Sequence, residues 1–144
     1  MLKLVRNILA VLAGIAIGGI VNMSIITISP LLIPPPEGVD VTNAESLGNA
    51  IHLFEPRHFI MPFLAHAIGT LAGSLMAYLI ATSYKLQFAY LIGGVFLCGG
   101  IAASFMIPAP FWFIALDLIA AYLPMAWLAI NLGSRLQRKT IAPD

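Results

Sequence analysis

The chain has 144 residues, of which 60% are hydrophobic and only 9% are charged, and its mean hydropathy is +0.98. Soluble domains carry about a quarter of charged residues, so this composition excludes a soluble globular protein and indicates a membrane protein. The length leaves room for one compact bundle without a separate catalytic domain. The net charge of +1 also argues against a nucleic-acid partner. We therefore expect the lipid bilayer to be the main partner.

Four apolar stretches follow one another along the chain, at residues 7–28, 58–82, 86–107 and 111–132. Each is long enough to cross a bilayer core of about 30 Å at about 1.5 Å per helical residue. The sequence thus predicts an all-α, polytopic membrane four-helix bundle that forms one domain over residues 1–144. Very short connections after the second and third stretches make the last three helices antiparallel neighbours.

A long outer loop, residues 29–57, joins the first two stretches. Pro30 and the run Pro34–Pro36 are expected to end the first helix. The segment Thr42–Glu45 has the form of a capping box, with Thr42 as the N-cap. Apolar residues then recur at helical spacing, and they are Leu47, Ala50, Ile51 and Phe54. This pattern predicts a short amphipathic helix over 43–54 that covers the outer end of the bundle.

The basic residues predict the orientation, because Lys and Arg near the ends of spans stay on the cytoplasmic side. With the N-terminus inside, six basic residues are cytoplasmic and only Arg57 is outside; the six are Lys3, Arg6, Lys85, Arg135, Arg138 and Lys139. The acidic residues Glu37, Asp40, Glu45 and Glu55 all fall in the outer loop. We expect both termini to lie in the cytoplasm.

Three polar residues inside the spans are the main candidates for a functional site, because each is costly in hydrocarbon unless it faces protein or water. Asn22, His66 and Asp117 all lie roughly 9 to 12 Å below the outer boundary at about 1.5 Å per residue. They are expected to form one polar layer. The hydroxyls of Thr70 and Ser104 can add to it.

Small residues share the faces of these polar side chains. Gly14 and Gly18 recur with Asn22 at spacings of four, and Gly69 and Gly73 follow His66 on its helix. Both pairs have the GxxxG spacing, at which membrane helices approach each other closely. We expect all four glycines to lie at helix–helix contacts.

The polar layer has three interpretations. It can be a hydrogen-bonded staple that fixes helix register, with each bond contributing about 1 kcal/mol. It can be an ionisable pocket, open to the outside, in which Asp117 exchanges a proton or holds a cation or solute. It can also face a sister subunit. Function is accordingly either the non-enzymatic binding or passage of a small solute or ion, which we favour, or a structural role in a homo-oligomer or larger membrane complex.

A second polar group comprises His52, Glu55 and His58, spaced three apart near the outer surface. Histidine and carboxylate at this spacing suit a divalent metal when they share one helix face. Pro56 interrupts that face, and in the alternative Glu55 caps the second span and pairs with Arg57. A metal-binding protein or membrane metalloenzyme is therefore the third functional class, and the sequence indicates no other cofactor.

Two prolines and one cysteine complete the pattern. Pro124 deprives the carbonyl of Ala120 of its donor and predicts a kink one turn below Asp117, and Pro62 is expected to act in the same way on His58. Cys98, the single cysteine, excludes an intramolecular disulfide and is expected to be a buried packing residue.

The most distinctive segments are Pro34–Asp40, with the sequence PPPEGVD, and His52–Pro56, with the sequence HLFEP. With these segments the chain resembles, over nearly its whole length, a family of small uncharacterised four-span proteins of bacterial genomes. The resemblance implies a location in the bacterial inner membrane and no particular activity.

Overall fold

The computed structural model describes residues 1–141 of the chain, and the described part is helical with short connections. The elements are α1 (Leu2–Leu32), α2 (Ala44–Ala50), η1 (Ile51–Leu53), η2 (Pro56–Phe59), α3 (Ile60–Ile80), α4 (Lys85–Met106), α5 (Phe111–Ala120) and α6 (Leu123–Ile141). Four segments are long and apolar enough to cross a membrane: Leu2–Leu32, Pro56–Ile80, Lys85–Met106 and Phe111–Arg138.

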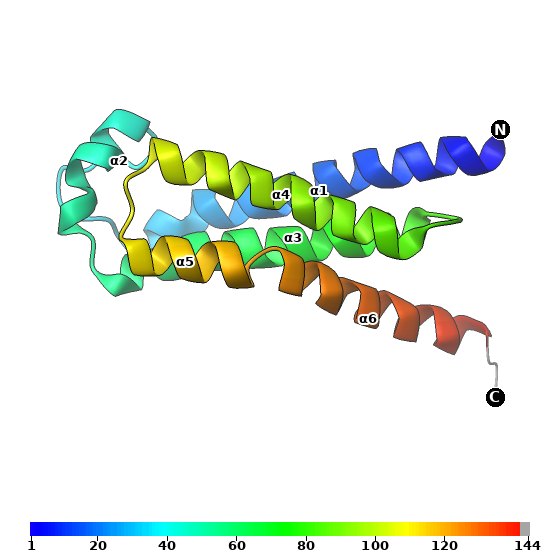
Figure 1. Ribbon diagram of the computed structural model, residues 1–144. Coiled ribbons are helices and arrows are strands. Elements are labelled where there is room, and N and C mark those ends of the chain that lie inside the picture. The colour runs from blue at the N-terminus through cyan, green and yellow to red at the C-terminus, as the bar shows by residue number, and fades with distance from the viewer. Residues whose placement is uncertain (142–144) are drawn as a thin grey trace.

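The four apolar segments form an elongated bundle in which α3 packs against α1, α4 and α6 (Figure 1). The start of α1 and the end of α6 lie at one end of the bundle, and α2 covers the other end. These segments match the four predicted spans, but the first and the last are longer than predicted: α1 covers 2–32 in place of 7–28, and α6 continues to Ile141 in place of ending at 132. Helix α1 continues through Pro30 to Leu32, so the loop begins later than predicted. A proline costs its helix only one hydrogen bond, and the apolar residues beyond it remain helical.

Helices α1 and α3 pack at backbone distance because glycines face each other across their contact. A Cβ atom on Gly14 would lie 2.9 Å from the Gly73 carbonyl oxygen, and one on Gly73 would lie 2.5 Å from the Gly14 carbonyl oxygen. Gly18 and Gly69 stand in the same relation one turn further along, with a Cβ on either 2.8 or 2.9 Å from the other's carbonyl oxygen. The predicted glycine contacts are confirmed, and they pair the two helices within one chain.

Polar side chains join the first helix to the α3–α4 turn at the end of the bundle where the chain starts. The buried Asn7 accepts hydrogen bonds from the backbone N–H and the hydroxyl of Thr82, both at 3.1 Å, and donates to the Ser83 hydroxyl at 2.9 Å. The Arg6 guanidinium donates to the Ile80 carbonyl at 3.2 Å. These bonds satisfy backbone groups at the end of α3, which has no further helical turn to supply partners.

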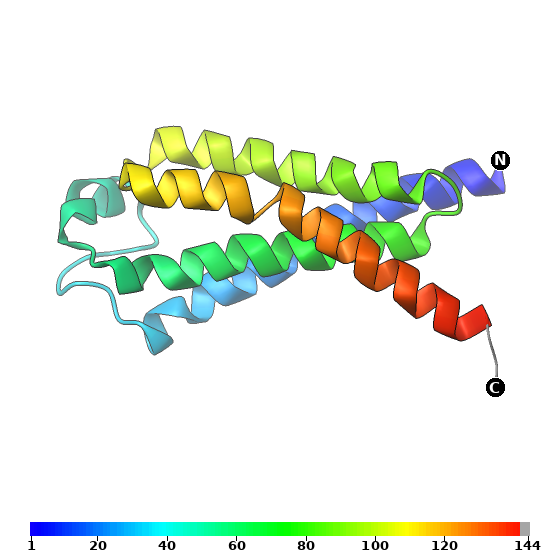
Figure 2. The same cartoon turned by 60° about the horizontal axis from the view of Figure 1, so that its bottom comes forward.

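The fourth apolar segment is broken into α5 and α6, and Figure 2 shows the change of direction between them. The break falls at Ala121 and Tyr122, immediately before Pro124, as the sequence predicts for the proline. Pro62 lies in the first turn of α3, directly after the 3-10 turn η2. Its predicted effect on the His58 carbonyl stays a prediction.

The outer loop folds into the short helix α2 and the 3-10 turn η1, in place of one helix over 43–54. Its N-cap is Asn43 and not Thr42: the Asn43 side chain accepts from the N–H groups of Glu45 and Ser46 at 2.9 and 3.0 Å. Thr42 is engaged elsewhere, since its hydroxyl and N–H both donate to Asp40. These bonds, the hydroxyl's first, hold the pKa of Asp40 below its usual value.

The outward faces of the helices are apolar over much of the bundle. Exposed large side chains occur on α1, α4 and α5, among them Leu12, Val95 and Ile119. Cys98 is exposed on α4 as well, so its predicted burial is wrong. A small apolar side chain at this position needs no protein partner where the face of its helix is itself apolar.

We expect Gly73→Leu to destabilise the protein strongly, because the new side chain would meet the α1 backbone, and overpacking costs about 1–3 kcal/mol or more. Gly19→Leu is the matched control, since a Cβ at Gly19 has no neighbour within 4 Å. Thermal unfolding in detergent measures both variants. Equal melting temperatures for the two would contradict the glycine contact.

Candidate functional site

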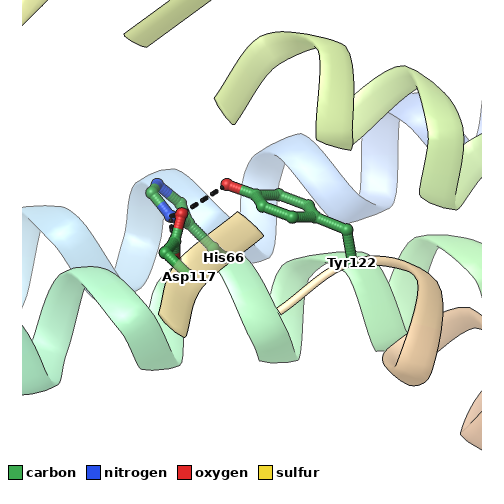
Figure 3. A network of polar contacts seen from close by, with 3 residues as sticks. All are labelled: His66, Asp117 and Tyr122. Atoms are coloured by element: carbon green, nitrogen blue, oxygen red, sulfur yellow. Dashed lines mark hydrogen bonds and ion pairs between the residues drawn. The ribbon is translucent and has the colours of Figure 1, made fainter. Parts of the chain in front are cut away.

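Three polar side chains meet where the fourth segment breaks (Figure 3). The Asp117 carboxylate lies near the end of α5, and the Nδ1 atom of His66 on α3 is 2.9 Å from its Oδ1 and 3.0 Å from its Oδ2. The Tyr122 hydroxyl donates to Oδ2 at 2.8 Å. Tyr122 also stacks on the His66 ring, with centroids 5.8 Å apart and planes at 28°. The predicted contact between His66 and Asp117 is confirmed.

The hydrogen bonds define which atoms donate in this triad. The Tyr122 hydroxyl donates to Asp117, and the contact of His66 Nδ1 with an ionised carboxylate requires the tautomer with a proton on Nδ1, because such a carboxylate only accepts hydrogen bonds. The His66 Nε2 atom has no partner within the described part of the chain. Asp117 and Tyr122 are buried, at 5% and 2% exposure, whereas the His66 side chain is 24% exposed. His66 is therefore the accessible member of the triad.

A cavity of about 260 Å³ lies beside the triad at the loop end of the bundle. Its lining includes His66, Asp117 and Ser104 from the helices and Val41, Leu47 and Ile51 from the loop segment between α1 and α3. Most of the remaining lining is apolar and includes Phe54, Phe59 and Phe113, of which Phe59 and Phe113 lie in ring contact at 4.7 Å. The cavity is thus mainly apolar, with the ionisable side chains of His66 and Asp117 in its lining, and residues between 41 and 54 contribute to it at the loop end of the bundle.

The remaining members of the predicted polar layer take other positions. Asn22 packs against Gly69 in the α1–α3 contact and makes no side-chain hydrogen bond with a described residue. Ser104 lines the cavity, but its hydroxyl donates to the Ile101 carbonyl of its own helix at 2.7 Å. Thr70 is fully buried deeper on α3. The layer predicted from depth alone is therefore divided between the triad and the helix contacts.

Tyr122 is the site residue that the sequence does not predict. On an uninterrupted helix it would lie five residues after Asp117, on a different face. The break at Ala121 and Tyr122 removes this restriction and brings the hydroxyl to the carboxylate. Gly100 on α4 leaves room for that hydroxyl, since a Cβ there would overlap it. The only signal in the sequence is the proline two residues later, which predicts the break but not its consequence.

His52, Glu55 and His58 do not converge, and no group of three metal-ligating side chains occurs among the described residues. His58 is buried and uses both ring nitrogens: Nδ1 accepts from the Glu55 N–H at 2.9 Å, and Nε2 lies 3.1 Å from the Pro34 carbonyl. It therefore ties the proline run to the start of the second span. Glu55 pairs with Arg57 at 3.0 Å on the surface, as the alternative interpretation predicts.

No family model, curated protein or solved structure matches this chain.

We expect Tyr122→Phe to lower the stability of the protein by about 1–3 kcal/mol, because the ring still packs while the carboxylate loses one hydrogen bond. Tyr90→Phe, which removes a hydroxyl from a residue 40% exposed on α4, serves as the control and should have no comparable effect. Chemical or thermal unfolding in detergent compares the two. An unchanged stability of the Tyr122 variant would mean that the hydroxyl bond contributes nothing.

Proposed function

We propose that this protein is a small, non-enzymatic membrane protein that binds, and passes, a small solute or ion at the His66–Asp117–Tyr122 triad. The single observation that supports this most is that His66 and Asp117, two members of the triad, line an apolar cavity. A staple that serves only packing has no need of an adjacent cavity. Intramembrane ionisable residues beside a cavity commonly belong to solute or proton paths.

The geometry of the triad favours ligands that donate hydrogen bonds. When the His66 ring carries its proton on Nδ1, it offers the lone pair of Nε2 to a donor, and the Asp117 carboxylate behind it favours a cation. The aromatic and aliphatic walls favour an apolar body. We infer that the ligand is a small molecule that consists of an amine, or another cationic hydrogen-bond donor, attached to an apolar group.

The broken fourth segment supports passage as well as binding. In transporters, discontinuous helices form the substrate site, because their interrupted turns expose backbone groups inside the protein. Here the break adjoins Asp117, and Pro124 supplies no N–H to the carbonyl of Ala120. The structural alternative is less well supported, since the glycine faces that would pair subunits are already paired between α1 and α3.

For location, we propose the inner membrane of a bacterium with both ends of the chain in the cytoplasm. The six-to-one distribution of basic residues supports this orientation. The placement of the start of α1 and the end of α6 at one end of the bundle agrees with an even number of spans.

Reporter fusions test this orientation. A fluorescent protein that matures only in the cytoplasm should be active when fused after residue 144, and a periplasm-only phosphatase should be inactive there. A phosphatase inserted in the outer loop, between Gly38 and Val39, is the matched control and should be active. The reverse pattern would refute the proposed topology.

Binding is tested with hexylamine and hexanoate, which share an apolar chain and differ in the charge of the polar end. Hexylamine should raise the melting temperature of the detergent-solubilised protein, by the equivalent of about 1.4 kcal/mol at ten times its Kd. Hexanoate should not, because it carries no donor and meets the Asp117 charge.

Asp117→Asn should fold and lose the response to hexylamine, since the amide keeps hydrogen-bonding capacity but not the charge. Glu45→Gln makes the same exchange at an exposed carboxylate of the outer loop and should keep the response. Identical responses of wild type and Asp117→Asn would reject the triad as a binding site.

A further inference from the structure

Two buried hydroxyls on α3 have no hydrogen-bond partner. Thr70 and Ser74 are both 0% exposed, and neither Thr70 Oγ1 nor Ser74 Oγ bonds to any described residue. In helices such hydroxyls usually donate to the carbonyl one turn earlier, as Thr27 and Ser24 of α1 do at 2.7 Å. Buried polar groups without partners are rare, and ordered water most often satisfies them.

Thr70 and Ser74 lie on the same side of α3 as His66, one and two turns further along the helix. His66, Thr70 and Ser74 follow at spacings of four on α3, so about 6 Å separates each from the next along the helix axis. Beyond Ser74 the buried residues of α3 are Ala77 and Tyr78, and Tyr78 packs in an apolar cluster with Ala89 of α4 and Ile130 of α6. The hydrogen-bonded group of Asn7, Thr82 and Ser83 lies beyond them.

We propose that Thr70 and Ser74 hold a short file of buried water molecules, which passes protons between the triad and the inner half of the bundle. The inference rests on the proposed function of the triad, and it adds a path for protons from the triad along α3. When a proton binds His66 Nε2, the ring gives its Nδ1 proton to the Asp117 carboxylate, and the carboxyl group then releases that proton to the first water. Each water then accepts one proton and releases another, so no net charge accumulates along the file.

Proton flux into vesicles tests the proposal. The purified protein is reconstituted into phosphatidylcholine and phosphatidylglycerol vesicles that contain a pH-sensitive dye, and a pH gradient is imposed with the potential clamped by potassium and valinomycin. Wild-type vesicles should lose the gradient faster than protein-free vesicles. The double variant Thr70→Val with Ser74→Ala should fall to the protein-free rate. The control, Thr27→Val with Ser24→Ala, removes the same groups from exposed positions of α1 and should keep the wild-type rate.

Thermal unfolding shows whether water molecules bond to the two hydroxyls or whether the hydroxyls are buried without any partner. If water satisfies them, the Thr70→Val and Ser74→Ala variant melts at a lower temperature than wild type, and Thr70→Ser, which keeps a hydroxyl, keeps the flux. A higher melting temperature would mean that dry, unpaired groups had been removed, and it would overturn the proposal. Wild-type flux no faster than in protein-free vesicles, or unchanged flux in the double variant, would also overturn it.

The hexylamine response distinguishes the two proposals. A double variant that binds hexylamine normally and conducts like wild type contradicts the water file alone. A wild-type protein that conducts through Thr70 and Ser74 without any response to hexylamine contradicts solute binding in the outer cavity and supports the file.

Discussion

The backbone contact between α1 and α3 is the interaction on which the rest of the bundle depends. Helix α3 packs against α1, α4 and α6. Its glycines lie so close to the α1 backbone that no side chain separates the two helices there. His66 reaches Asp117, and the buried hydroxyls lie further along the helix. His66 precedes Gly69 by three residues and Gly73 by seven, so the polar contact lies beside the glycine contact on the same side of α3.

The break in the fourth segment determines the composition of the site. An uninterrupted helix would give Asp117 the His66 donor alone. The two non-helical residues at 121 and 122 supply a second donor, whose ring also covers the imidazole. Two donors on one buried carboxylate satisfy much of its hydrogen-bonding capacity, and this compensates for the loss of water around the charge. Within the described part of the chain, the triad nitrogen without a hydrogen-bond partner is His66 Nε2, and His66 is the partly exposed residue of the three.

Most of the fold could be predicted from the sequence, because apolar length, glycine spacing and proline positions act locally. The helix contacts at Gly69 and Gly73 and the pairing of His66 with Asp117 followed from periodicity and depth. Thr42 is not the N-cap because its hydroxyl donates to Asp40. No local sequence rule tells whether a threonine caps a helix or bonds to a nearby carboxylate. The predicted direction of the Asn22 side chain is wrong for a different reason. Its depth along the helix follows from the sequence, but its direction depends on how α1 is turned about its own axis against α3. Tyr122 could not be placed because the geometry of a helix break is set by its tertiary surroundings.

The short length of α5 has a consequence for how the chain enters a bilayer. Its ten residues span about 15 Å, half of a hydrocarbon core, so α5 cannot cross without α6. An aspartate at the centre of a membrane-spanning helix costs about 2.5–3.5 kcal/mol to insert, and each Phe, Leu or Ile residue, of which α5 has several, offsets about 0.3–0.6 kcal/mol. In the proposed membrane topology His66 enters the bilayer before Asp117, because the chain is made from its N-terminus. The last segment would then insert against a partner residue that the second segment already holds.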